Sequence, residues 1–220
     1  MKSTEIIGVY KKNDKLFTEN LASSKGIKAY NEKLVKIEGK EFRSWNPYRS
    51  KLAAAIHKGL NIADMSSDAN VLYLGAATGT TVSHVSDIAK NGAVYAIESS
   101  PIAMKKLLEV VKKRGNVIPI LADANHPDRY SHIVSSVNVL YQDISQRNQA
   151  ELFIKNCERF LQKNGLGILM AKARSVDVSL KPKEVYETLS KELQKYGFKI
   201  IDIKELSPFE KDHAAFVVRW

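Results

Sequence analysis

After Pro47, short apolar runs alternate with segments whose apolar residues recur at helical spacing. Each run is long enough for a buried strand and is followed by a helical segment or by a loop that can precede one. The runs occupy residues 70–74, 93–97, 117–122, 137–141 and 167–171. Parallel strands are buried on both faces and need helical crossovers between them. The alternation therefore predicts an α/β fold with a doubly wound, mostly parallel sheet.

Two helices have boundaries that the sequence marks. Ser100 can cap the first helix, and Pro101 suits its first turn. The second begins near Pro182 and ends at Gly197, a residue type favoured just past a helix C-terminus. The apolar residues at helical spacing are Met104, Leu107, Leu108 and Val111 in the first helix, and Val185, Leu189, Leu193 and Tyr196 in the second.

The last two apolar segments form a different pattern. Residues 198–206 and 214–220 are strand-like, and SPFEKDH between them is too short for a helical crossover. This predicts an antiparallel hairpin at the end of the parallel sheet. Such a sheet resembles the Rossmann-like fold of class I methyltransferases.

The first forty residues differ from the rest. Short alternating segments between residues 6 and 42 are separated by turn signals at residues 13–14, 23–26 and 38–39. This predicts a small β-rich N-terminal domain over residues 1–44, followed by a larger domain over residues 45–220.

The composition is that of a folded, soluble protein, with 44% hydrophobic and 26% charged residues. Lys and Arg number 34 against 24 Asp and Glu, a net charge of +10 that favours polyanionic partners, although solvated helix faces would explain it as well. The single cysteine, Cys157, excludes a disulfide framework within the chain. No apolar run approaches the roughly 20 residues that span a bilayer, so we expect a cytoplasmic protein without a membrane partner.

A loop of small residues, GAATGTT at 75–81, follows the first buried strand. Gly75 and Ala76 would let the backbone approach a ligand at the carboxyl end of the strand, where open α/β sheets bind ligands. A tight turn is the plainer explanation, because the spacing is not that of G-x-G-x-x-G. Glu98 ends the next strand about 20 residues further on, where an acid can bind the ribose hydroxyls of a cofactor.

Two more acids belong to the same sheet edge. Asp123 follows the third predicted strand and Asp143 follows the fourth, so both should lie beside Glu98. Each alone could simply end a strand or cap a helix. Together they predict a binding cleft, which would suit a hydride-transfer cofactor as well as a methyl donor.

Several longer segments decide between these cofactors, because they resemble the fibrillarin family of RNA methyltransferases. They are WNPYRSKLAAAI (45–56), VLYLGAATGTTVSHV (71–85), KRGNVIP (113–119), DANHP (123–127) and PFEKDHA (208–214). The resemblance runs from about Trp45 to the C-terminus. It implies a methyltransferase that uses S-adenosylmethionine and modifies ribose 2′-hydroxyls of rRNA and tRNA.

The resemblance also implies which residues bind S-adenosylmethionine. By the family pattern these are Thr80, Thr81, Glu98, Asp123, Ala124, Asp143 and Gln146; Gly75, Ala76, Ser99, Ile144 and Ser145 complete the candidate cofactor site. Two positions depart from the pattern. Ser99 stands where members usually have an aromatic residue, and Ser145 stands where they usually have alanine.

Four further residues would form a catalytic tetrad by the same resemblance: Lys51, Asp143, Lys172 and His213. A ribose hydroxyl must lose its proton to become a nucleophile. Lys172 could accept that proton only when neutral, and a nearby Asp143 favours the charged ammonium. The base therefore stays open between Lys172 and His213. Without the resemblance, Lys172 would be read as a strand-end lysine reaching solvent and His213 as a surface loop residue. No metal site is predicted.

The resemblance also implies partners. They are a box C/D guide RNA that pairs with the target rRNA or tRNA, a Nop-family scaffold protein, and a kink-turn-binding protein of ribosomal type. The chain lacks a glycine-arginine-rich tail, which indicates the compact archaeal form. Two rival hypotheses remain. One is a non-catalytic RNA-binding or scaffold subunit on the same fold, and the other is a methyltransferase acting on a protein or a small molecule.

Overall fold

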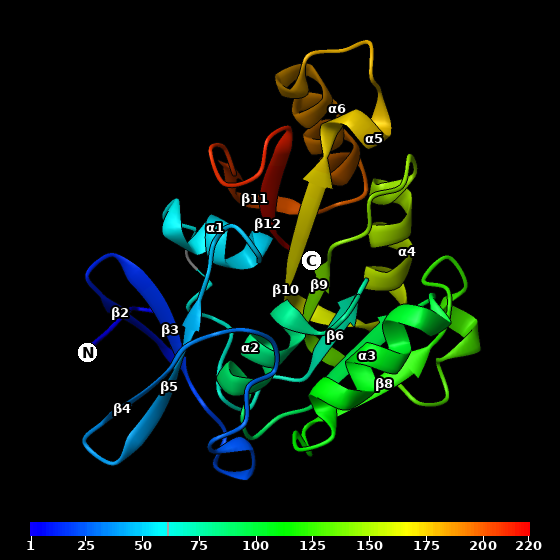
Figure 1. Ribbon diagram of the computed structural model, residues 1–220. Helices are drawn as coiled ribbons and strands as arrows, with labels where there is room; N and C mark the ends of the chain where they lie inside the picture. The colour runs from blue at the N-terminus through cyan, green and yellow to red at the C-terminus, as the bar shows by residue number, and fades with distance from the viewer. Residues whose placement is uncertain (61) are drawn as a thin grey trace.

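The computed structural model describes residues 1–60 and 62–220, which form two sheets with flanking helices (Figure 1). The N-terminal sheet is antiparallel and five-stranded, in the order β1-β2-β3-β5-β4. Its strands are β1 Lys2–Ser3, β2 Val9–Lys12, β3 Lys15–Glu19, β4 Leu34–Ile37 and β5 Lys40–Trp45. Two-residue turns with positive φ at Asn13-Asp14 and Glu38-Gly39 close two of its hairpins, as the sequence predicts.

The larger sheet has seven strands in the order β11-β12-β10-β9-β6-β7-β8. They are β6 Val71–Leu74, β7 Val94–Glu98, β8 Val117–Leu121, β9 Val137–Gln142, β10 Leu161–Lys172, β11 Lys199–Glu205 and β12 His213–Arg219. β6 to β10 pair in parallel, and β12 lies antiparallel between β10 and β11. The predicted fold class, including the closing hairpin, is confirmed.

The helices are α1 Lys51–His57, α2 Thr80–Ile88, α3 Pro101–Val111, α4 Gln149–Phe160, α5 Ala173–Val176 and α6 Pro182–Lys195, with 3₁₀ turns η1 Ala22–Ser24 and η2 Pro127–Arg129. The predicted cap of α3 is confirmed, because Ser100 Oγ accepts from Ala103 N at 3.3 Å. The predicted stripe of α6 is correct except at its end. Tyr196 is 50% exposed, because the helix closes there and Gly197 turns the chain with φ +89°.

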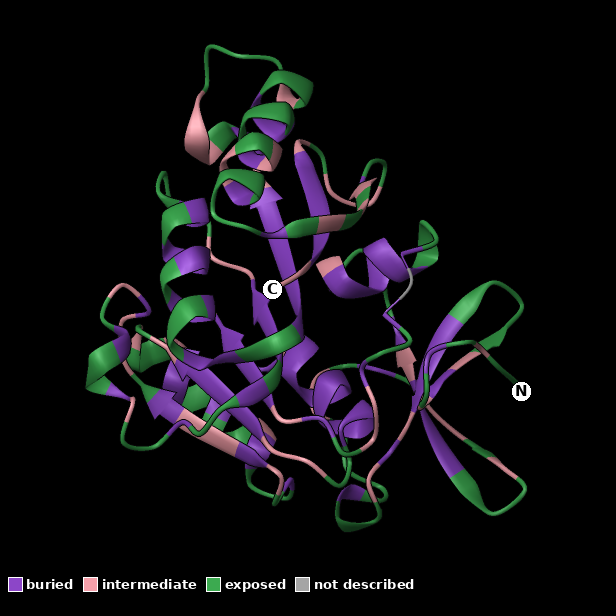
Figure 2. Cartoon of the chain, turned by 180° about the vertical axis from the view of Figure 1, so that it is seen from behind, coloured by how far each residue is buried: buried purple, intermediate pink, exposed green. Residues whose placement is uncertain are grey.

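Helices cover both faces of the larger sheet. Along β6, Val71 and Tyr73 join a core with α1, α2 and α3, whereas Leu72 and Leu74 join a second core with α4 and α6. This alternation follows from the two-residue period of a strand. Figure 2 shows the strands as the buried layer between partly exposed helices. No helix in the described part of the chain is long and apolar enough to cross a bilayer.

The N-terminal sheet packs on α2 and shares the first core. Leu16 and Trp45 lie in the same apolar cluster as Val85 and Ile88 of α2. The N-terminal sheet ends at Trp45, next to the boundary predicted after residue 44. The division into domains 1–44 and 45–220 stays a prediction.

Candidate functional site

The carboxyl ends of β6, β7, β8 and β9 surround a cavity of about 200 Å³. Eight of the predicted cofactor residues line it. They are Gly75, Glu98, Ser99, Asp123, Ala124, Asp143, Ile144 and Gln146. The sequence reasoning missed three lining residues, Ala77, Ile97 and Ala122, although each lies within two residues of a predicted one. The shared sheet edge thus brings together acids that are far apart in the chain.

Gly75 sets the shape of the cavity wall. Its φ is +84°, and a Cβ at this position would lie 2.4 Å from the Asp143 carbonyl oxygen. The Asp143 N–H donates to the Leu74 carbonyl at 2.9 Å. Only a residue without a side chain lets the loop after β6 come this close to Asp143.

Backbone groups hold the Glu98 carboxylate in place. Oε2 accepts from Ala77 N at 2.7 Å, and Oε1 accepts from Ser100 N at 2.8 Å. Because both donors are backbone amides, the loop after β6 and the start of α3 fix this acid at the cavity wall. The carboxylate has further lone pairs for hydroxyl donors of a ligand.

Asn125 connects Asp123 with Gln146 on the other side of the cavity. Its backbone N–H and its side-chain amide both donate to Asp123 Oδ1 at 2.9 Å, and the amide also donates to Gln146 Oε1 at 3.1 Å. These hydrogen bonds, led by the backbone one, hold the pKa of Asp123 below its ordinary value despite partial burial. Asp123 is therefore an ionised acceptor at neutral pH.

Four predicted cofactor residues are not in the cavity lining: Ala76, Thr80, Thr81 and Ser145. Thr81 is buried, and its hydroxyl donates to Ser50 Oγ at 3.0 Å. Thr81 does not line the cavity because it lies on the side of α2 that packs against the start of α1. A role for these four residues in cofactor binding stays a prediction.

Two of the four predicted catalytic side chains are in direct contact. Lys51 Nζ donates to Asp143 Oδ1 at 2.6 Å, and the two side chains are only 20% and 17% exposed. Lys51 is the first residue of α1, whose N-cap is Ser50. Asp143 also lines the cavity, so this ion pair lies at its wall.

The other two are register partners in the sheet. Lys172 ends β10 and His213 begins β12, and they pair directly across the antiparallel ladder. His213 is 7% exposed rather than at the surface, and its Nδ1 lies 2.7 Å from the Lys211 carbonyl oxygen. A carbonyl only accepts, so Nδ1 carries the proton and a neutral ring keeps Nε2 as an acceptor.

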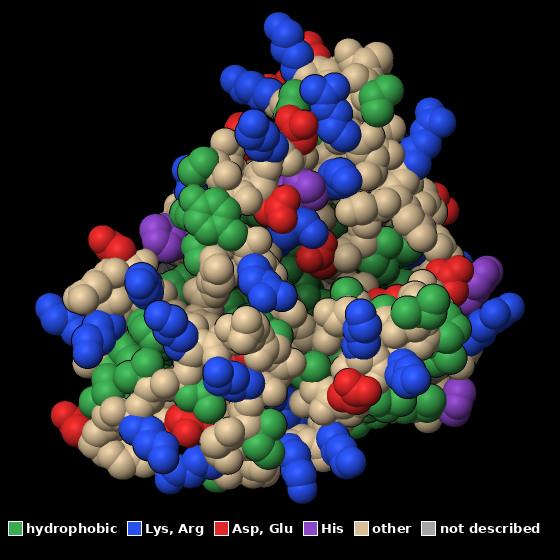
Figure 3. Space-filling model, viewed as in Figure 1, with side chains coloured by type: hydrophobic (Ala, Val, Ile, Leu, Met, Phe, Trp, Pro, Cys, Tyr) green, Lys and Arg blue, Asp and Glu red, His purple; other side chains and the backbone are tan. Residues whose placement is uncertain are grey.

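The sheet brings the two pairs to the same edge. Leu169 of β10 pairs with Gln142 of β9, so the ends of both strands, with Lys172 and Asp143, leave the sheet together. Figure 3 shows basic, acidic and histidine side chains gathered in the hollow at the centre of this face. A cavity with carboxylate acceptors thus adjoins two lysines, an aspartate and an imidazole.

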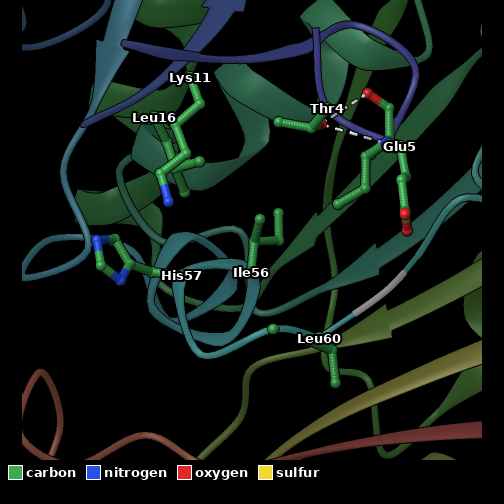
Figure 4. Close-up of a pocket in the computed structure, with 9 residues that line it drawn as sticks. Thr4, Glu5, Lys11, Leu16, Ile56, His57 and Leu60 are labelled. Carbon is green, nitrogen blue, oxygen red and sulfur yellow. Dashed lines mark hydrogen bonds between the residues drawn. The ribbon is translucent and has the colours of Figure 1, made fainter. Parts of the chain in front are cut away.

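A second cavity, of about 310 Å³, lies between the N-terminal residues and the end of α1 (Figure 4). Lys11, Leu16, Ile56 and His57 are among its lining residues. None of the predicted cofactor and catalytic residues is among the residues that line it.

Comparison with known proteins agrees with this geometry. A family model described as Fibrillarin matches residues 1–220, so the match includes the N-terminal sheet and extends beyond the motifs that begin at Trp45. A Methanocaldococcus jannaschii protein described as fibrillarin-like rRNA/tRNA 2′-O-methyltransferase is 52% identical over 196 residues, which cover 89% of this chain and 85% of the relative.

Solved structures give the same result. Aeropyrum pernix fibrillarin, in complex with natively bound S-adenosylmethionine, has a TM-score of 0.89 at 40% identity, covering 99% of this chain and 96% of that one. The fibrillarin of a fibrillarin/Nop5p complex has a TM-score of 0.89 at 42% identity, covering 100% of both chains.

Proposed function

The chain belongs to the fibrillarin family, and on that premise we propose that it transfers methyl groups from S-adenosylmethionine to ribose 2′-hydroxyls of rRNA and tRNA, as the catalytic subunit of a box C/D guide ribonucleoprotein. The observation that carries this proposal is the position of Asp143. It lines the cavity at the strand ends and forms an ion pair with Lys51. The cofactor and the ribose that accepts the methyl group would therefore meet at Asp143.

The cavity residues fit S-adenosylmethionine. Glu98 offers its carboxylate to ribose hydroxyls, and the ionised Asp123 accepts from N–H donors. Gly75 leaves open the space that a side chain would fill. The acids also suit a ligand that carries positive charge. When bound, the cofactor supplies an electrophilic methyl group on its sulfonium.

The tetrad residues would orient and deprotonate the ribose hydroxyl. Of the two candidate bases, we propose His213, because its Nδ1–H donates to the Lys211 carbonyl and leaves Nε2 to accept a proton. Lys172, its register partner, would stabilise the developing negative charge on the hydroxyl oxygen. Lys51 would hold Asp143 in its orientation through their ion pair.

The complex of fibrillarin with Nop5p supports a Nop-family scaffold as a partner. We propose a box C/D guide RNA and a kink-turn-binding protein as further partners, and the net charge of +10 agrees with binding to RNA. The archaeal relatives support a cytoplasmic location in an archaeal cell.

The test is transfer of labelled methyl from S-adenosylmethionine to rRNA and tRNA fragments, with and without guide RNA and scaffold proteins. We expect 2′-O-methylnucleosides at guided positions only in the full assembly. Asp143→Ala should lower the rate by at least about 100-fold, because it removes an orienting group. Asp128→Ala, at a side chain that is 86% exposed, is the matched control.

The outcomes separate the rival hypotheses. No transfer despite cofactor binding and complete assembly would favour a non-catalytic subunit. Transfer to protein or a small molecule, without 2′-O-methylnucleosides, would favour the other rival. Near-normal turnover by a folded Asp143→Ala variant would remove Asp143 from the mechanism.

A further inference from the structure

A groove of about 500 Å³ lies between the N-terminal sheet, α1 and the loop before β12. We call it the junction groove and define it by its lining segments, residues 14–16, 30–33, 44–49, 57 and 209. Leu16 and His57 line both this groove and the cavity in Figure 4, so the two hollows adjoin at the end of α1. None of the predicted cofactor or catalytic residues belongs to it.

Aromatic side chains line the end of the groove nearest the tetrad. Tyr48 is 63% exposed, and its ring meets the edge of Phe209 with centroids 5.1 Å apart. Tyr48 precedes Lys51 by three residues and Phe209 precedes His213 by four. These steps limit the Cα separations to about 11 and 15 Å. The aromatic end is thus within a few nucleotides' reach of the proposed target ribose.

Cations also line the groove. Lys15, Lys33 and Arg49 are exposed, and the Arg49 guanidinium lies 5.2 Å from the centre of the Tyr30 ring. Figure 3 shows many Lys and Arg side chains over the N-terminal sheet, at the lower left of the view.

The acids of the groove already have cationic partners. The Asp14 carboxylate is 3.0 Å from Lys11 Nζ, and the buried Glu32 carboxylate is 2.8 Å from Arg43. The groove also contains a polar group without a partner among the described residues, the buried indole Nε1 of Trp45. Because its acids are paired, the exposed Lys15, Lys33 and Arg49 leave the groove with an excess of positive charge.

We propose that the junction groove binds an unpaired stretch of the target RNA strand next to the ribose that is methylated. Tyr48 stacks on a base, and Lys15, Lys33 and Arg49 contact phosphates. Proteins that hold single-stranded nucleic acid combine aromatic platforms with a basic groove in this way. The inference rests on the proposed function and gives the N-terminal sheet a part in substrate binding. Lys15 and Lys33 favour RNA over a protein partner here, because lysine is depleted in protein–protein interfaces.

The first test measures binding of the whole chain to a fluorescein-labelled, 12-nucleotide single-stranded RNA by anisotropy at several salt concentrations. Tyr48→Ala should weaken binding by about tenfold or more through lost stacking, and Tyr48→Phe should retain it. Lys33→Ala should weaken binding and reduce the salt dependence by about one counterion. Tyr196→Ala and Lys195→Ala are matched controls, because both residues are exposed at the end of α6, outside the groove.

Calorimetric titration of each variant with S-adenosylmethionine checks that the cofactor site is intact. The groove proposal fails if Tyr48→Ala binds RNA as wild type does, or if the wild-type chain shows no binding at low salt. It also fails if Tyr48→Ala loses only the scaffold protein, because that result identifies a protein interface. RNA binding through the groove without methyl transfer in the full assembly would contradict the proposed function and leave the groove assignment in place.

Discussion

The side chain of Gln149 holds the backbone of Lys172 from two sides. Its Nε2 donates to the Lys172 carbonyl at 3.1 Å, and the Lys172 N–H donates to its Oε1 at 3.0 Å. Gln149 is fully buried, and its own carbonyl accepts from Gln142 Nε2 at 2.7 Å. Gln149 is therefore a positioning residue for Lys172, at the point where β10 leaves the sheet.

Gln149→Ala should lower kcat by about 10- to 100-fold, since small displacements of a catalytic group are costly and Lys172 is one of the proposed catalytic residues. It should leave the affinity for S-adenosylmethionine nearly unchanged, because Gln149 does not line the cofactor cavity. Single-turnover rates and calorimetric titration give the two quantities. Gln162→Ala is the control, because Gln162 is an exposed amide on β10, the strand that Lys172 ends. Equal loss of cofactor affinity and rate would indicate general disruption rather than misplacement of Lys172.

The loop between β6 and α2 depends on Gly75 for its approach to the end of β9. Gly75→Ala should weaken cofactor binding by more than about tenfold, because the new Cβ would push the loop away from Asp143. It should also lower the free energy of unfolding by more than the backbone strain alone, about 1–2 kcal/mol. Titration with S-adenosylmethionine and urea unfolding measure these effects.

Gly39→Ala separates strain from steric overlap. Gly39 has φ +78°, close to that of Gly75, but a Cβ there would meet nothing within 4 Å. Only the strain cost is expected in this variant, with normal cofactor affinity. If both substitutions had equal effects, the close approach to Asp143 would have no part in the site.

Strand positions could be predicted because burial on both faces leaves continuous apolar runs, as in β6 and in the first four residues of β7. β10 begins at Leu161, earlier than the predicted 167, because residues 162–165 are polar or glycine and enter the sheet through a register shift against β9. The burial of His213 was not predictable from its loop sequence, since it results from pairing with β10. The tetrad and the cofactor residues came from the family motifs, not from periodicity.

At the scale of the whole molecule, a buried ionic cluster joins the N-terminal sheet to α2. Asp87 accepts from Arg43 at 2.7 Å and from Arg114 at 2.6 Å, and all three side chains are at most 2% exposed. These residues come from three distant segments, so no local pattern could predict the cluster. Removing one partner would leave a buried charge uncompensated, which usually costs about 3–5 kcal/mol.

His84 makes this junction sensitive to pH. The ring is fully buried between Trp45, Thr18 and Tyr30. Burial, followed by the charges of Arg43 and Arg114, holds its pKa well below the ordinary 6.5. Asp87 lies 4.0 Å from Nδ1, but its carboxylate is already bound by the two arginines. The folded chain therefore keeps His84 neutral.

As the pH falls, His84 takes up a proton in the unfolded chain before it does so in the folded chain. The free energy of unfolding therefore decreases below the ordinary histidine pKa of 6.5. Between about pH 6.5 and 5.5, the free energy of unfolding should fall with a slope of up to about 1.4 kcal/mol per pH unit. Burial raises the pKa of the neighbouring Glu32, but the charge of Arg43 and several backbone hydrogen bonds together hold it below its ordinary 4.5, so Glu32 contributes only at lower pH. Urea unfolding at a series of pH values should show the slope in wild type and in His132→Asn, an exposed control.

His84→Asn should be less stable than wild type, but its free energy of unfolding should be nearly independent of pH over this range, because the titrating ring is gone. If the slope persisted unchanged in His84→Asn, another group would have to bind the proton.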